Sequence, residues 1–175
     1  AGTPVSRGRD APDQAPYDVP AEVFGAHGAC VLYRRAALAE VGLFDDDFFA
    51  YHEEFDLAWR LRLAGWTARY VPLARVLHHE GLSLRSQPAR ILYLTERNRL
   101  WALIKNAGLA FLWRALPALL AREVQMLRHC LGMRTPVPLV ARLSALARLG
   151  PMLARRARVQ ALRRVSDAEI ERWLV

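Results

Sequence analysis

Cysteine and lysine are scarce in this 175-residue chain. The two cysteines, Cys30 and Cys130, stand a hundred positions apart, which excludes the paired Cys-x-x-Cys spacing of a structural zinc site. We therefore expect two buried thiols and no disulfide, as is usual in a reducing cytoplasm. Lysine occurs once, at Lys105, so almost all of the positive charge is arginine.

A nucleotide-binding pattern and a long apolar run are also missing. No glycine-rich phosphate loop and no alternating strand–helix–strand period precede Tyr17, which argues against a phosphate-binding unit in these first residues. After residue 105, the longest stretch without a charged side chain is the eight residues 106–113. A bilayer span needs about 20 such residues, so we expect no transmembrane helix in this part of the chain.

The positive charge is confined to one end of the chain. Residues 1–106 hold 13 basic and 13 acidic side chains, whereas residues 107–175 hold 12 arginines and 4 acids and so carry the net charge of +8. Arginine interleaved with leucine and alanine is typical of basic amphipathic helices on an anionic membrane surface. A solvated face of ordinary core-packing helices is the alternative. Nucleic acid is a less favoured partner, because no aromatic platform, zinc motif or helix-turn-helix accompanies the arginines.

Hydrophobic periodicity and capping signals predict the secondary structure. We expect short strands at 23–25, 29–33, 67–71 and 75–79, and helices at 35–41, 53–64, 87–106, 109–131, 139–162 and 167–174, with Ser86 as the N-cap of the third helix.

One acidic and aromatic segment is the most informative part of the chain. Six of the residues 45–56 are acidic, and large aromatic residues are threaded between them. Aromatic rings favour burial, whereas carboxylates resist it unless they are paired, metal-bound or facing a polar cleft, so the mixture indicates a site. Glu53 and Glu54 suit the N-terminus of a helix, where the dipole favours negative charge. Asp56 and Arg60 have the i, i+4 spacing of an ion pair.

Three ordered motifs resemble those of family-2 inverting glycosyltransferases, especially the rhamnosyltransferase-like bacterial members. They are GLFDDDFFAYHEEFDLAWRLRLAGW at 42–66, RYVPLARVLHHEGLSLRS at 69–86 and YLTERNRLWALIKN at 93–106. The resemblance implies an α/β fold, namely the C-terminal half of a GT-A (Rossmann-like) nucleotide-sugar transferase domain followed by amphipathic α-helices. It divides the chain into a loop entered mid-domain (1–16), an acceptor-binding and catalytic half (17–106) and an arginine-rich amphipathic helical tail (107–175).

The resemblance also implies the catalytic residues. The family's general base is a carboxylate at a helix start, and it falls on Glu54, with Glu53 in the preceding acidic position; glutamate here replaces the usual aspartate. Two adjacent carboxylates raise each other's proton affinity, which suits a base. His78 falls on a histidine that ligates a metal or contacts the diphosphate in related enzymes. The alternatives are a solvated acidic helix start for the glutamates and a buried structural histidine for His78.

Further positions are expected around these groups. Tyr51, Gly25 and Gly28 are candidates for acceptor binding, and Arg85 and Arg97 for phosphate binding, with an exposed or helix-packing role as the alternative for the arginines. Structural roles are expected for Asp45, Asp56 and Arg60, the first as a cap on the segment that follows it.

The implied activity is sugar transfer, with rhamnose as one expected sugar, from a nucleotide-diphosphate sugar to a lipid-linked or polysaccharide acceptor in bacterial cell-envelope synthesis. The resemblance implies a divalent cation, Mg²⁺ or Mn²⁺, bound largely by an N-terminal half outside this sequence, without which we expect no activity. It places the enzyme in the cytoplasm, peripheral to the inner face of the plasma membrane. The alternative is a non-catalytic, membrane-associated or nucleic-acid-binding basic helical protein.

Overall fold

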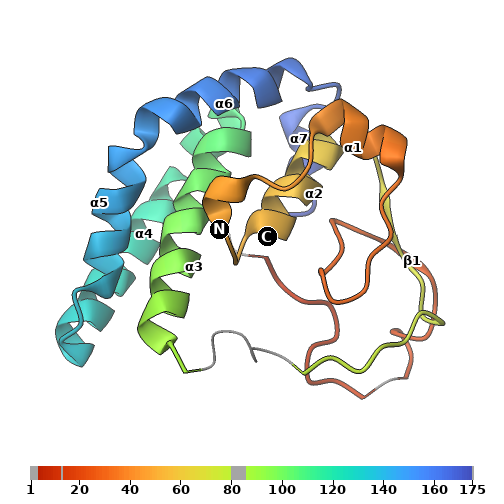
Figure 1. Ribbon diagram of the computed structural model, residues 1–175, viewed down its shortest axis with the longest axis horizontal. Coiled ribbons are helices and arrows are strands. Elements are labelled where there is room, and N and C mark those ends of the chain that lie inside the picture. Colours follow the sequence, from red (N-terminus) through yellow and green to blue (C-terminus); the bar gives the residue numbers. More distant parts are fainter. Residues whose placement is uncertain (1–3, 13, 80–85, 175) are drawn as a thin grey trace.

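The computed structural model describes residues 4–12, 14–79 and 86–174. The elements along the chain are β1 (Ala21–Val23), α1 (Arg35–Val41), the 3-10 helix η1 (Asp46–Phe48), α2 (Glu53–Leu63), β2 (Ala68–Tyr70), α3 (Pro88–Asn106), α4 (Leu109–Met133), α5 (Val137–Ala147), α6 (Leu149–Ala161) and α7 (Asp167–Glu171). Helices α3 to α6 lie together on one side of the molecule, and the N-terminal segment with β1 lies on the other (Figure 1).

All of the predicted helices are present, but one of them is divided into two helices. The helix expected at 139–162 is broken between α5 and α6. Pro151, in the first turn of α6, favours a break here because a proline has no N–H to bond the carbonyl four residues earlier, although Pro117 is accommodated inside α4. Helix α3 begins at Pro88 with Gln87 at its N-cap, so the predicted cap at Ser86 was one residue early.

The predicted strands are only half right. β1 and β2 form an antiparallel two-stranded sheet in which Glu22 lies opposite Arg69, a favourable cross-strand charge pair. The segments 29–33 and 75–79 are not strands. The chain forms a turn at or just before each segment instead. The Cys30 N–H donates to the His27 carbonyl at 3.3 Å, and the Ala74 N–H donates to the Val71 carbonyl at 3.0 Å.

Arg62 ties the sheet to α2. Its Nη1 lies 2.5 Å from a carboxylate oxygen of Glu22, and its Nε donates to the Phe24 carbonyl at 3.0 Å. Its guanidinium also stacks on the Trp173 ring, 4.5 Å from the ring centroid. One buried arginine therefore joins β1, α2 and the end of the chain.

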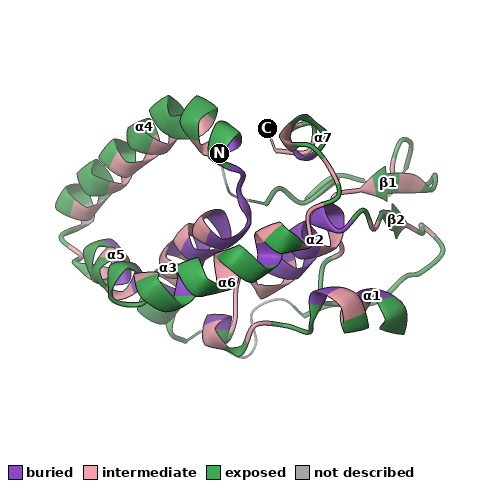
Figure 2. Ribbon diagram, turned by 90° about the horizontal axis from the view of Figure 1, so that it is seen from above, coloured by how far each residue is buried: buried purple, intermediate pink, exposed green. Residues whose placement is uncertain are grey.

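The main hydrophobic core crosses the boundary between residues 106 and 107. Phe55, Trp59 and Trp101 from α2 and α3 share one cluster with Met152 and Val159 from α6. Buried residues are concentrated in α2 and α3, whereas most of α4 is exposed (Figure 2). The C-terminal helices therefore help to enclose the helix that carries the acidic segment.

Both cysteines are free, as predicted. Burial was wrong for Cys30, which is exposed, while Cys130 is half-buried. Cys30 is exposed because it lies in the turn that follows Gly28, outside the helical core.

Among the described residues, no single helix is long and apolar enough to cross a bilayer. Helices α5 and α6 are bent by 64° relative to each other, and only the two together are long and apolar enough to cross a bilayer.

Candidate functional site

The start of α2 is preceded by a turn in an unusual backbone conformation. Phe49, Tyr51 and His52 have φ values of 64°, 66° and 67°, in the left-handed region that non-glycine residues seldom occupy. Such conformations cost free energy and persist only where the surroundings hold them, often at functional sites. This turn sets the direction in which the first residues of α2 leave the core.

Asn98 of α3 holds this turn. Its fully buried side-chain amide donates to the carbonyls of Phe48, Ala50 and Tyr51 at 2.9, 2.8 and 2.7 Å. Arg97 supports the same place, because its Nη2 donates to the Asp47 carbonyl at 3.0 Å and its Nε to the Asn98 side-chain oxygen at 2.9 Å. The backbone groups that the turn leaves without helix or sheet partners are thus satisfied by α3.

Glu53 and Glu54 leave this turn side by side at the N-terminus of α2, both half-buried. Burial raises the pKa of the Glu53 carboxyl, and the negative charge of Glu54 raises it further, against the opposing effects of its own backbone N–H and of His27. A Glu53 carboxylate oxygen is buried without a hydrogen-bond partner. Glu53 is therefore held at a helix start in surroundings that favour its protonated form.

Gly28 lies directly against Glu54. A Cβ atom at position 28 would stand 2.0 Å from the Glu54 Oε1, a distance that no side chain tolerates. Gly25 serves a different purpose, because a Cβ there would stand 2.3 Å from the Cβ of Ala58. Gly25 lets the segment approach α2, and Gly28 leaves room for the carboxylate of Glu54.

Two further side chains lie at the carboxylate pair. The pKa of Tyr33 is raised, first by burial and then by the negative charges of Glu54 and Glu53. The His27 ring packs edge-to-face against that of His78, with centroids 5.8 Å apart. The site therefore combines two carboxylates at the start of α2 with the Tyr33 phenol and the His27 imidazole from the segment after β1, and His78 adjoins it through His27.

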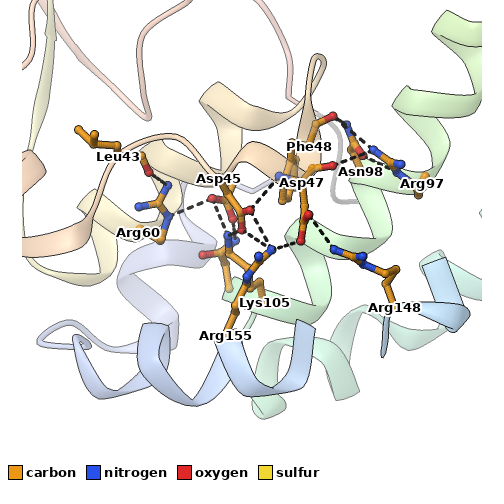
Figure 3. Close-up of polar contacts among 12 residues, drawn as sticks. Leu43, Asp45, Asp47, Phe48, Arg60, Arg97, Asn98, Lys105, Arg148 and Arg155 are labelled. Carbon is orange, nitrogen blue, oxygen red and sulfur yellow. Dashed lines mark hydrogen bonds and ion pairs between the residues drawn. The ribbon is translucent and has the colours of Figure 1, made fainter. Parts of the chain in front are cut away.

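A buried polar cluster supports α2 from below (Figure 3). The carboxylate of Asp56, fully buried, accepts from Arg60 Nε and Lys105 Nζ at 2.9 Å each and from Asn106 Nδ2 at 2.8 Å. Arg60 then bonds the carbonyls at the end of α1, including that of Val41 at 2.6 Å. Asp56 therefore links α1, α2 and α3, and its pairing with Arg60 follows the predicted i, i+4 spacing.

Asp45 joins this cluster from the other side. Its Oδ1 accepts from the Asp47 N–H at 3.2 Å, which caps η1. Lys105 and Arg155 bind its carboxylate at 2.6 and 2.8 Å. Arg148 binds Asp47 at 2.7 Å, so Asp45 and Asp47 are neutralised by side chains of α3, α6 and the residue that joins α5 to α6.

His52 is buried and neutral in this arrangement. Burial, together with the positive charges of Arg99 and Arg122, lowers its pKa to about 4. In the unfolded chain a histidine protonates near pH 6.5. The native state therefore gains stability from His52 that is complete above pH 6.5 and is lost as the pH falls from 6.5 to about 4.

We predict that His52→Asn flattens this pH dependence. Asparagine tolerates the left-handed backbone at residue 52. The native protein should lose on the order of 3 kcal/mol between pH 7 and pH 4 through this residue, and the variant should lack that part of the loss. Urea unfolding at several pH values measures it, with exposed His129→Asn as the matched control. An unchanged pH profile in His52→Asn contradicts the assignment.

The structure brings together some of the site residues predicted from the sequence and leaves others apart. Glu53, Glu54 and Gly28 lie together, with Tyr51 in the turn just before the two glutamates. Arg97 is engaged with backbone carbonyls, and its guanidinium lies 4.1 Å from the centroid of the Trp101 ring. Phosphate binding by Arg97 is therefore an untested prediction for a side chain with structural partners. Arg85 lies outside the described residues.

The described residues do not supply a metal site. His78 is exposed and has His27 as its ring neighbour. Within 4–12, 14–79 and 86–174, no three histidine, cysteine or acidic side chains are grouped so as to hold a metal ion. The divalent cation that the resemblance implies was expected largely on residues outside this sequence, and the described residues around His78 form no group that would hold it.

Sequence reasoning missed three residues of this site. His27 stands between Gly25 and Gly28 and was passed over in favour of the glycines. Asn98 stands between two arginines in a helix, and a polar residue at a core-facing position is the signal that would have identified it. Tyr33 carried no local signal, because only the folded chain places it beside α2.

A pair of carboxylates at a helix start, one of them with a raised pKa, is an arrangement that can accept a proton. Residues 13–157 match the family model described as glycosyl transferase family group 2, and the chain belongs to this family. Membership implies a GT-A type fold, to which the described residues contribute mostly helices and one two-stranded sheet.

Curated relatives cover a shorter region. The chain is 50% identical over 62 residues to an N-acetylglucosaminyl-diphospho-decaprenol L-rhamnosyltransferase of Mycobacterium tuberculosis, which is 35% of this chain and 20% of the relative. It is 40% identical over 62 residues to a pre-mycofactocin glycosyltransferase of the same species, which is 35% of this chain and 13% of the relative. The matches thus span a fifth or less of each relative's length. No solved structure matches the chain.

Proposed function

We propose that this chain supplies the acceptor side and the general base of an inverting glycosyltransferase, as the C-terminal half of an α/β GT-A domain. The donor is a nucleotide-diphosphate sugar, with rhamnose as the first candidate because one relative is named a rhamnosyltransferase. The acceptor is lipid-linked or a glycan of the bacterial cell envelope. The enzyme acts in the cytoplasm at the inner face of the plasma membrane, where a lipid-linked acceptor is within reach.

The chemical step needs one proton acceptor from this chain. The acceptor hydroxyl oxygen attacks the anomeric carbon of the donor and forms the new glycosidic bond. The bond from that carbon to the phosphate oxygen breaks, the nucleoside diphosphate leaves with the electron pair, and the hydroxyl proton passes to Glu54. Attack opposite the leaving group inverts the configuration of the anomeric carbon.

The observation that carries the proposal is the position of Glu54. Its carboxylate lies at the start of α2, against Gly28, on a turn that Asn98 fixes through three hydrogen bonds. A base on a fixed backbone is held in one geometry toward the acceptor, and such positioning is a large part of catalysis. Glu53 and Tyr33 lie close enough to Glu54 to interact with its charge.

Transfer by the complete gene product tests the proposal. The protein is incubated with a nucleotide-diphosphate rhamnose, or with other nucleotide sugars, and with a synthetic lipid diphosphate that carries N-acetylglucosamine. We expect a glycosylated lipid whose new linkage has the anomeric configuration opposite to that of the donor, as the one-bond carbon–proton coupling constant at the anomeric carbon reports. Retention of configuration, or no transfer from any donor, contradicts the proposal.

Gly28→Ala is predicted to reduce transfer without unfolding the protein. The new Cβ would displace the Glu54 carboxylate, and a misplacement of about 1 Å lowers rates by up to roughly a hundredfold. The rate should fall about tenfold to a hundredfold, while the thermal unfolding midpoint stays near that of the native protein, because the displaced group is the end of a flexible side chain. Gly150→Ala is the control, since a Cβ there contacts nothing within 4 Å. Full activity in Gly28→Ala contradicts the placement of the base.

A further inference from the structure

The outer face of α4 is a continuous apolar stripe. Seven large apolar side chains on it are exposed, from 41% at Leu116 to 78% at Trp113. They are Leu109, Trp113, Leu116, Leu120, Val124, Leu127 and Leu131. The opposite face of α4 packs on the core through residues such as Phe111. Helix α4 is therefore apolar on two sides, and the described residues cover one of them.

The spacing of the apolar residues keeps the stripe nearly straight along α4, which suits contact with a flat surface. Its members repeat every eleven residues, as in Leu109, Leu120 and Leu131, which is about 3.67 residues per turn. At about 100° per residue the stripe stays within an arc of about 80°, along about 33 Å of helix. A left-handed coiled-coil partner selects a period of 3.5 residues, so the repeat disfavours a left-handed coiled coil with a second copy of the chain.

The charges that α4 itself carries beside the stripe are positive. Glu123 is the only acid in α4, and it is bound to Arg99 and Arg142 on the inner side. Arg114 and Arg128 lie at about 80–120° from the centre of the stripe, by the same 100° per residue. Arg114 is paired with Glu171 of α7, whereas Arg128 is exposed. A face with exposed leucine and tryptophan, flanked by arginine and without a free carboxylate, is complementary to anionic headgroups over an apolar layer.

We propose that the outer face of α4 is the surface by which the protein docks on an anionic lipid bilayer. The helix lies in the plane of the interface with the stripe inserted among the acyl chains and Trp113 at the headgroup level. The inner side of α4 stays bound to α3 through ion pairs such as Arg122 with Glu96 at 2.7 Å. The proposal concerns lipid alone and stands whether or not the protein transfers sugar.

Brominated lipids give a direct test, because Trp113 is the one fully exposed tryptophan of the five, all of which are described. The complete gene product is mixed with vesicles of brominated phosphatidylcholine containing phosphatidylglycerol, and tryptophan quenching and co-sedimentation are recorded. We expect quenching that Trp113→Phe abolishes. The double variant Leu120→Glu, Leu127→Glu should lower the vesicle partition coefficient about tenfold or more.

Matched controls separate the stripe from general stickiness. Leu32→Glu with Leu73→Glu changes two leucines that are even more exposed than Leu120 and Leu127 but lie outside α4, and it should bind vesicles like the native protein. Leu120→Ser with Leu127→Ser repeats the test without new charge, and circular dichroism checks the fold of each variant. Binding should weaken on vesicles of pure phosphatidylcholine.

Three results would overturn the proposal. The first is vesicle binding that both α4 double variants leave intact. The second is equal binding to neutral and anionic vesicles. The third is a stable dimer in sedimentation equilibrium that Leu120→Glu, Leu127→Glu dissociates, with no binding of the native protein to lipid, since the stripe would then be a protein interface.

Discussion

Replacing Asp56 by alanine is expected to lower the free energy of unfolding by about 3–5 kcal/mol, the cost of removing one partner from a buried ion pair. Asp56 is completely buried and accepts from two cations and one amide. Without it, Lys105 keeps only Asp45, and the Asn106 amide keeps only the carbonyl of Ala102. The loss should be visible as a large shift of the urea unfolding midpoint.

Asp46→Asn is the matched control for this prediction. Asp46 belongs to the same acidic segment but is exposed, and surface substitutions away from special features change stability by about 0.5 kcal/mol or less. If Asp56→Ala were as mild as Asp46→Asn, the polar cluster beneath α2 would not be the support that the geometry indicates.

Replacing Glu54 by glutamine is expected to lower the rate of sugar transfer by roughly 10²–10⁴-fold, the usual contribution of a general base. Glutamine keeps the size of the side chain and its contact with Gly28 but cannot accept the hydroxyl proton. Donor binding should be little affected, so the loss should fall on kcat. Initial rates of transfer by the complete gene product measure it, with thermal unfolding as the check on folding.

Glu53→Gln distinguishes the two carboxylates. Glu53 has the raised pKa but lies one position earlier on the helix. If Glu54 is the base, Glu53→Gln should cost much less than Glu54→Gln, because Glu53 then acts on the electrostatics of its neighbour. The opposite order of effects would move the role of base to Glu53.

Signals that are local in sequence predicted local structure well. The bounds of α1 and the start of α2 follow from Gly42 and from the acidic first turn, both of which lie within a few residues of the helix they end or begin. The pairing of Asp56 with Arg60 is likewise contained in one helical turn. Such features depend on neighbours in the chain, which the sequence displays directly.

Features that depend on distant residues were not predictable in this way. Asn98 holds a turn about fifty residues earlier in the chain, and Lys105 reaches Asp45 across sixty. The prediction of a strand at 29–33 was wrong for the same reason. A strand needs a neighbouring strand to pair with, and the hydrophobic pattern of a segment does not show whether the fold provides one. The role of α4 also required the fold, because only the folded chain shows which of its two apolar faces is covered.

The pH dependence of sugar transfer tests the central claim most directly, namely that the carboxylate pair at the start of α2 takes the acceptor proton through Glu54. In the native protein, kcat/KM should fall toward low pH as the pair takes up a proton. In Glu54→Gln, the residual rate should lose this acid limb and become nearly independent of pH in the same range. An acid limb that persists unchanged in Glu54→Gln would contradict the claim, because the essential base would then lie elsewhere.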